Sequence, residues 1–240
     1  MAPPQGMGRE IGQGIMNQMA QASLSTELIY AFVIIIISLM IYFGTRELYN
    51  LTNHKGIKYF RLSFLFFAIA YFFRSIMKAI IVFVDPQTLR EIMFNVGNAF
   101  NPLILFLFMY FSSMAIFFLL YSVMIKKWNG KINFVMFFNA IAVFIALTTI
   151  LTNSAKFILL IHFLLFLFVA FIALMAYKES KNKKKTHGLY FAYIFLFIFW
   201  LLNILDILIP NAFQSFQLLI YLISLGLFLM ILYKVLRKTA

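Results

Sequence analysis

Long apolar stretches, separated by short polar loops, follow one another along the chain from residue 28 to residue 235. There are seven of them, at residues 28–45, 57–84, 99–125, 132–152, 155–177, 188–209 and 212–235. Each approaches or exceeds the roughly 20 apolar residues that cross a bilayer core as a helix. The stretches are continuous and do not alternate with a period of two, which excludes a transmembrane β-barrel. We therefore predict an all-α membrane protein, a seven-transmembrane-helix bundle over residues 27–240.

The first 26 residues lack the basic start and apolar core of a cleavable signal peptide. Ile11, Ile15, Met16 and Met19 nevertheless recur at helical spacing. Such a segment either lies on the membrane surface as a short amphipathic helix or forms an irregular tail. We expect residues 1–26 to be an extracytoplasmic N-terminal tail.

The composition supports a membrane protein. Hydrophobic residues make up 64% of the chain and charged residues 11%, whereas soluble domains carry about 25% charged residues. The chain contains no cysteine, which excludes disulfides, thiol chemistry and cysteine-ligated metals. The net charge of +13 lies mainly in the loops, so it indicates membrane topology and not nucleic-acid binding.

Lysine and arginine are distributed unequally between the two sets of loops. The loops after the first, third, fifth and seventh stretches contain fifteen of them, and the opposite set contains Arg9, Arg90 and Lys156. The positive-inside rule therefore predicts a multi-pass plasma-membrane protein with its N-terminus outside and its C-terminus in the cytoplasm. A cluster in one cytoplasmic loop would attract anionic lipid headgroups or a cytoplasmic protein. Its members are Lys181, Lys183, Lys184 and Lys185.

Short polar motifs occur twice, in the same order, in the two halves of the chain. Arg46-Glu47 and then His54-Lys55-Gly56 follow the first stretch, while Lys178-Glu179 and then His187-Gly188 follow the fifth. The third and seventh stretches open on Asn98-Ala99-Phe100 and Asn211-Ala212-Phe213. We predict a parallel 3+1+3 repeat related by an axis along the membrane normal. Its parts are repeat 1 at 27–125, a linker helix at 132–152 and repeat 2 at 155–238.

This plan resembles that of microbial rhodopsins and of SWEET-type sugar carriers, in architecture only. The seventh stretch has no internal lysine where rhodopsins bind retinal, since Lys234 stands at its end. The Pro86-Gln87 pair lies in an outer loop, whereas the carriers would require such a pair within a helix. The sequence therefore identifies neither family.

Charged residues inside the apolar stretches are the main candidates for function. Arg74 and Lys78 are four residues apart and share one face of the second predicted helix. Arg74 lies about 24 Å from the cytoplasmic end of its helix, and Asp206 about 27 Å along the sixth, at 1.5 Å per residue. Charges at this depth are costly and usually functional.

Other polar residues fall in the same outer third of the bundle. They are Asn98, Asn101, His162, Asn203, Gln214, Gln217 and Tyr221. One interpretation is an outward-facing polar cup with a formal charge of +1, from Arg74, Lys78 and Asp206, which would favour an anionic or zwitterionic ligand. The other is structural: Asp206 pairs with Arg74 or Lys78, and the amides join neighbouring helices.

These patterns favour a receptor-like or sensor-like protein, because the polar groups are confined to the outer half. A small-solute transporter is the alternative that the repeat suggests, and a structural subunit of a membrane complex is a third. No Ser/His/Asp set, HExxH motif or phosphate-binding glycine loop occurs. We therefore expect no enzyme activity, cofactor or metal site.

Overall fold

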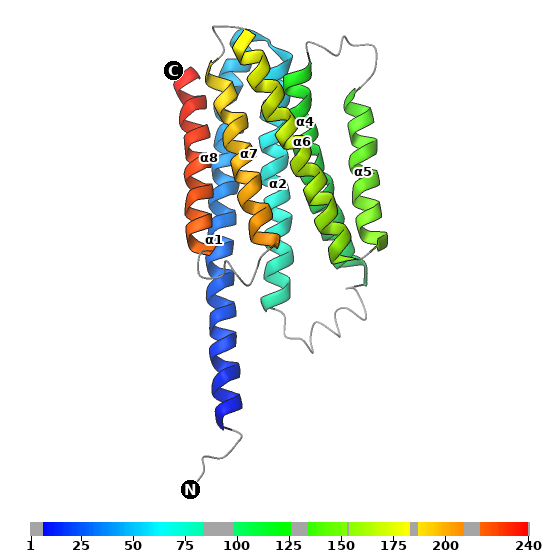
Figure 1. Ribbon diagram of the computed structural model, residues 1–240, viewed down its shortest axis with the longest axis vertical. Coiled ribbons are helices and arrows are strands. Elements are labelled where there is room, and N and C mark those ends of the chain that lie inside the picture. The colour runs from blue at the N-terminus through cyan, green and yellow to red at the C-terminus, as the bar shows by residue number, and fades with distance from the viewer. Residues whose placement is uncertain are drawn as a thin grey trace.

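The computed structural model is all-helical over the part of the chain that it describes, residues 7–83, 98–125, 134–152, 154–182, 187–208 and 217–239. Within these ranges it contains seven helices (Figure 1). They are α1 (Met7–Thr52), α2 (Lys55–Phe83), α4 (Asn98–Met124), α5 (Phe134–Thr152), α6 (Ala155–Asn182), α7 (His187–Leu208) and α8 (Gln217–Thr239). The prediction of an all-helical protein with seven helices is confirmed for the described residues.

Six of the seven helices are long and apolar enough to cross a membrane. The exception is α7, whose described apolar section, Phe191–Leu202, is shorter. Large hydrophobic side chains also cover the outside of the bundle: Phe144 is 67% exposed and Leu222 62%. An apolar exterior around an equally apolar interior is stable only in a bilayer. The protein is therefore a multi-pass membrane protein.

The first helix differs from the expectation for residues 1–26. Instead of a separate surface helix or an irregular tail, α1 is one continuous helix of 46 residues that begins at Met7. At 1.5 Å per residue its length is about 69 Å, roughly twice the thickness of a bilayer core. Its apolar section begins at Ser25, and Figure 1 shows the preceding turns extending beyond the other helices.

A tight turn joins α1 to α2 and accounts for part of the repeated loop motif. Asn53 takes a left-handed conformation (φ 49°), and its N–H donates to the Tyr49 carbonyl oxygen at 2.8 Å. The Gly56 N–H donates to His54 Nδ1 at 3.1 Å. A Cβ at Gly56 would lie 2.9 Å from the Ser122 carbonyl oxygen, so only glycine lets α2 start this close to α4. In the connection between α1 and α2, the histidine and glycine of the motif therefore build a turn.

Six of the helices form a closed ring. Neighbours in contact are α1 and α2, α2 and α4, α4 and α6, α6 and α7, α7 and α8, and α8 and α1. The remaining helix, α5, lies outside the ring against α4 and α6, and Figure 1 shows it at the edge of the bundle.

Aromatic side chains fill the centre of this ring. Phe60 and Phe64 of α2 are 1% and 0% exposed. Their rings meet Tyr193 of α7 at a centroid distance of 5.8 Å and Phe228 of α8 at 6.2 Å. Phe199 of α7 packs on Phe228 at 4.5 Å. Since these residues reach across the ring from three helices, the interior is a packed core and not an open channel.

Candidate functional site

The two ends of the bundle differ in charge. We call the end at which the apolar part of α1 begins, at Ser25, the N-terminal face, and the end that carries the α1–α2 turn the C-terminal face. Among the lysines and arginines whose side chains the structure describes, Arg74 alone lies in the half next to the N-terminal face. The others lie at the C-terminal face: Arg46, Lys55, Lys58, Arg61, Lys178, Lys234 and Arg237.

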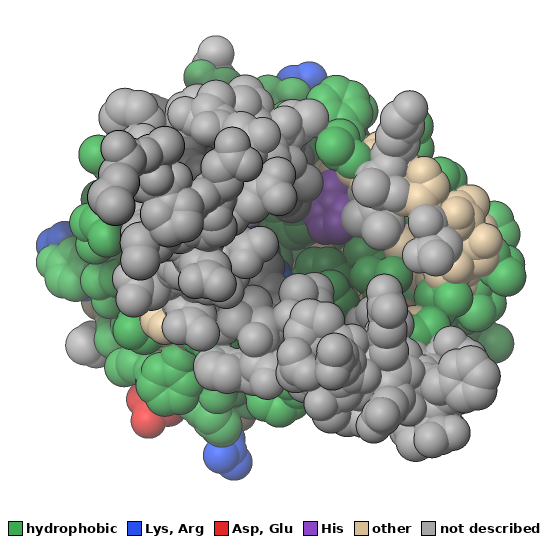
Figure 2. Space-filling view, turned by 90° about the horizontal axis from the view of Figure 1, so that it is seen from below, with side chains coloured by type: hydrophobic (Ala, Val, Ile, Leu, Met, Phe, Trp, Pro, Cys, Tyr) green, Lys and Arg blue, Asp and Glu red, His purple; other side chains and the backbone are tan. Residues whose placement is uncertain are grey.

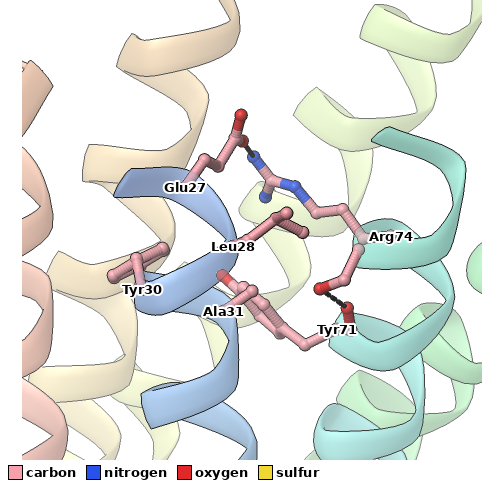
Figure 3. Close-up of a pocket in the computed structure, with 7 residues that line it drawn as sticks. Glu27, Leu28, Tyr30, Ala31, Tyr71 and Arg74 are labelled. Atoms are coloured by element: carbon pink, nitrogen blue, oxygen red, sulfur yellow. Dashed lines mark hydrogen bonds and ion pairs between the residues drawn. The ribbon is translucent and has the colours of Figure 1, made fainter. Parts of the chain in front are cut away.

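Arg74 forms the one salt bridge found among the described residues. Its Nη2 lies 3.3 Å from Oε1 of Glu27, so the bridge joins α2 to α1. The two side chains point toward each other across the space between these helices (Figure 3). They are 16% and 11% exposed, respectively. The pair is therefore largely removed from water but within reach of the N-terminal face.

Three tyrosines, one each from α1, α2 and α8, form a connected series of ring contacts that reaches this ion pair through Tyr71. The rings of Tyr30 and Tyr221 stack with centroids 4.4 Å apart, and Tyr30 meets Tyr71 edge-on at 6.3 Å. The guanidinium carbon of Arg74 lies 5.7 Å from the centre of the Tyr71 ring. This distance suits a cation–π contact. The rings therefore give the ion pair a polarisable wall on the side of the core.

A small cavity opens beside the ion pair. Glu27, Arg74, Ser75, Tyr30 and Tyr71 are among its lining residues, and Figure 3 shows the Glu27 and Arg74 side chains meeting at one end of this group. Its volume of about 10 Å³ holds roughly one water molecule. A larger ligand fits here only if Glu27 and Arg74 separate.

A second polar grouping lies on the other side of the ring. His162 of α6 is 7% exposed, and its ring lies 6.1 Å from Phe108 of α4 and 6.4 Å from Trp200 of α7. Figure 2, a view onto the N-terminal face, shows a histidine within a hollow between hydrophobic side chains. No group of three or more histidines or acidic residues that could hold a metal occurs among the described residues.

Polar contacts nearer the C-terminal face join helices to one another. The hydroxyls of Ser122 and Tyr193 share a hydrogen bond of 2.9 Å between α4 and α7. Arg61 Nε donates to the Tyr42 carbonyl oxygen at 3.0 Å and so links α2 to α1. These contacts are structural.

Three predicted site residues are described, and they divide between the two groupings. Arg74 and Tyr221 belong to the first grouping and His162 to the second. The side chains of the others lie outside the described residues: Lys78, Asn98, Asn101, Asn203, Asp206 and Gln217, together with the whole of Gln214. Of the lysines expected to attract lipid, Lys181 is described only in its backbone, as part of α6, and Lys183, Lys184 and Lys185 lie outside the described residues.

The sequence pattern did not identify Glu27, because this residue immediately precedes the first predicted apolar stretch, residues 28–45. Including it changes the charge of the site. The formal charges of Arg74, Lys78, Asp206 and Glu27 sum to zero, where the first three sum to +1. Tyr30, Tyr71 and Trp200 were also missed, because aromatic residues in an apolar run look like ordinary core. The signal that could have found Glu27 is its rarity, as one of seven acidic residues in the chain.

Comparison with known proteins finds one relative over almost the whole chain. An Archaeoglobus fulgidus protein described as "Uncharacterized protein" is 30% identical over 221 residues, which cover 90% of this chain and 93% of the relative. No protein-family model matches the chain. No solved structure matches it either.

Proposed function

The chain belongs to the same family as the Archaeoglobus fulgidus protein, and we propose that it is a receptor or sensor that binds a small zwitterionic solute at its N-terminal face. The observation that carries this proposal is the Glu27–Arg74 ion pair beside a cavity. A buried ion pair seldom repays the cost of removing both charges from water. Charges at this depth therefore usually serve a ligand or a conformational change.

The two charges of the pair suit the two charges of an amino acid or a similar zwitterion. A guanidinium such as that of Arg74 holds a carboxylate through two parallel hydrogen bonds. The Glu27 carboxylate would accept hydrogen bonds from the ammonium group. The Tyr30 and Tyr71 rings, which line the same cavity, would contact the apolar part of the solute. Such a ligand replaces one ion pair by two, so binding would not leave either charge alone.

A receptor is favoured over a carrier because the core blocks a path to the other face. A carrier needs a site near the midplane that both sides can reach in turn. Here Phe60, Phe64 and Phe228 fill the ring between the ion pair and the C-terminal face. The described helices also lack an internal break at that level, since α2 runs without interruption from Lys55 to Phe83.

A small-solute carrier of the 3+1+3 type is the second candidate, favoured by the order of the ring. The contacts of α1 with α2, α2 with α4 and α4 with α6 are matched by those of α6 with α7, α7 with α8 and α8 with α1. A two-fold axis along the membrane normal would produce this order, with α5 as the linker outside the ring.

The burial of equivalent residues agrees with such a repeat. Phe60, Phe64 and Phe67 of α2 are buried. So are three residues of α7 with the same spacing, Ala192, Leu196 and Phe199. Related positions therefore face the core in both proposed copies.

Aromatic contacts at the N-terminal face agree as well. When the copies are aligned on Arg46 and Lys178, Tyr30 corresponds to His162. Tyr30 of α1 stacks on Tyr221 of α8. In the same way, His162 of α6 stacks on Phe108 of α4, so each contact joins the first helix of one copy to the third helix of the other.

The distribution of charge supports an orientation with the site outside the cell. The described cationic side chains other than Arg74 lie at the C-terminal face, which the positive-inside rule places in the cytoplasm. We extend this orientation to the plasma membrane and to the Lys181–Lys185 cluster, which would then face anionic headgroups of the inner leaflet. The Glu27–Arg74 pair would open to the exterior.

Thermal unfolding of the purified protein in lipid nanodiscs tests zwitterion binding. A panel of amino acids is compared with amines and carboxylates that have the same side chains but lack one of the two charges. We expect at least one amino acid to stabilise the protein, by about 2.7 kcal/mol at a hundred times its Kd. The matched amine and carboxylate should have little effect, because each leaves Glu27 or Arg74 unpaired.

The matched control is the Glu27→Gln/Arg74→Gln double variant, which should not respond to the amino acid. Equal stabilisation by the amine or the carboxylate alone would contradict zwitterion binding, as would an unchanged unfolding temperature across the whole panel.

A further inference from the structure

The indole N–H of Trp200 is buried without a hydrogen-bond partner. Trp200 is 7% exposed, and its Nε1 has no acceptor within reach. Buried serine hydroxyls such as that of Ser113 can rotate toward a carbonyl of their own helix. An indole N–H is a donor only and has one fixed direction. Lipid hydrocarbon has no hydrogen-bond acceptor. A bound molecule could therefore supply the acceptor that this indole N–H lacks in the structure.

The surroundings of Trp200 combine one polar ring with two apolar ones. His162 and Phe67 each lie 6.4 Å from the Trp200 ring, measured between centroids, and the Phe108 ring lies 6.1 Å from that of His162. His162 and Trp200 lie at similar depths, about 10 Å and about 12 Å from the helix ends at the N-terminal face, at 1.5 Å per residue. The hollow at that face contains a histidine (Figure 2).

The proposed repeat relates this place to the Glu27–Arg74 cavity. His162 and Phe108 occupy the positions that Tyr30 and Tyr221 occupy in the other copy. There the tyrosine pair stands beside a cavity with charged walls. Around His162 and Trp200 the structure describes no charged side chain. The polar group at this place is the indole N–H of Trp200, which has no hydrogen-bond partner.

We propose that the space between α4, α6 and α7 is a second binding site, for a compound with a carbonyl or carboxylate oxygen next to an aromatic or aliphatic body. The oxygen accepts a hydrogen bond from Trp200 Nε1, and the imidazole of His162 provides a second polar contact. Phe67 and Phe108 contact the apolar body. Because Nε1 is covered in this structure, the oxygen reaches it only if the indole or its neighbours shift, so binding must change the environment of the indole.

Tryptophan fluorescence reports such a change directly. The chain has two tryptophans, so a Trp128→Phe variant leaves Trp200 as the sole emitter. Benzoate, which has a carboxylate and a flat apolar ring, is titrated onto this variant in nanodiscs. Ethylbenzene lacks the acceptor, and acetate lacks the ring. We expect a saturable change of emission with benzoate that neither control compound produces at the same concentration.

Two further variants assign the response to the site. Trp128→Phe/His162→Phe keeps a ring of similar size and should weaken benzoate binding at least tenfold. Trp200→Phe in the natural background keeps an aromatic side chain, although a smaller one, and removes the donor. It should abolish any rise in unfolding temperature caused by benzoate. An unchanged emission, an equal response to ethylbenzene, or full stabilisation of Trp200→Phe by benzoate would overturn the second site.

This result is separable from the proposed function. The Glu27→Gln/Arg74→Gln double variant, which should lose its response to the amino acid, should keep its response to benzoate. Loss of both responses in that variant would mean that benzoate binds at the ion pair and would overturn a separate site at Trp200.

Discussion

Replacing Glu27 by Gln should lower the free energy of unfolding by about 3 kcal/mol, because the substitution removes the carboxylate opposite the largely buried Arg74 charge. Arg74→Gln should have a similar effect for the reciprocal reason. The double variant should be more stable than the sum of the two losses predicts, since no charge of the pair then remains. Thermal and denaturant unfolding of the four proteins in the same detergent measures all three differences.

The coupling energy from this double-mutant cycle decides which carboxylate pairs with Arg74. We expect about 1 kcal/mol or more between Glu27 and Arg74, above the roughly 0.5 kcal/mol within which independent sites add. The matched cycle pairs Arg74→Gln with Asp206→Asn, the partner that the sequence first suggested. Additive effects in the Glu27 cycle and strong coupling in the Asp206 cycle would contradict the ion pair seen here.

Phe64→Ala should be the most damaging single change in the centre of the ring, at a cost of about 3–5 kcal/mol. Phe64 is 0% exposed and its ring contacts those of Phe60, Phe67 and Phe228. In a membrane, transfer of an apolar group between lipid and protein gains little. The loss therefore comes from the contacts around the cavity that the ring leaves behind.

Phe144→Ala is the matched control for this substitution. The same atoms are removed, but Phe144 is 67% exposed on α5 and faces outward from the bundle. We expect a change below about 0.5 kcal/mol, the range of surface substitutions without special contacts. Equal unfolding temperatures for the two variants would show that α2 does not fill the ring as described.

The membrane-spanning helices could be predicted from the sequence because the bilayer imposes both their length and their polarity. The start of α1 could not. Residues 7–24 do not form an apolar stretch. Hydropathy therefore locates the point where the chain enters the membrane, and not the residue at which the helix begins. The helix continues to Met7 because an α-helix satisfies its own backbone hydrogen bonds in water as well as in lipid. No proline interrupts it between Met7 and Ser25.

The candidate site could be predicted only in part, for a different reason. The positions of Arg74 and His162 along their helices gave their depth, since depth follows from the rise per residue. Their neighbours depend on which helices are adjacent, and that order is a tertiary property. Because α1 lies beside α2, Arg74 meets Glu27, a residue at the edge of a predicted stretch. Because α6 lies beside α7, His162 meets Trp200, which the sequence pattern alone assigns to the core.

We expect the proposed site to open only at the N-terminal face of the bundle. The most direct test is to find from which side of the membrane cysteines placed in the protein interior react. The chain has no cysteine, so single cysteines in sealed vesicles can be exposed to a membrane-impermeant methanethiosulfonate from each side in turn. Ser25→Cys and Lys178→Cys, at exposed positions, mark the N-terminal and C-terminal faces. Ser75→Cys, in the lining of the Glu27–Arg74 cavity, should react only from the side on which Ser25→Cys reacts. Ser63→Cys, at a fully buried position of α2, should react from neither side. Reaction of Ser75→Cys from both sides, or of Ser63→Cys from the Lys178 side, would contradict a one-sided receptor site and indicate a transport path.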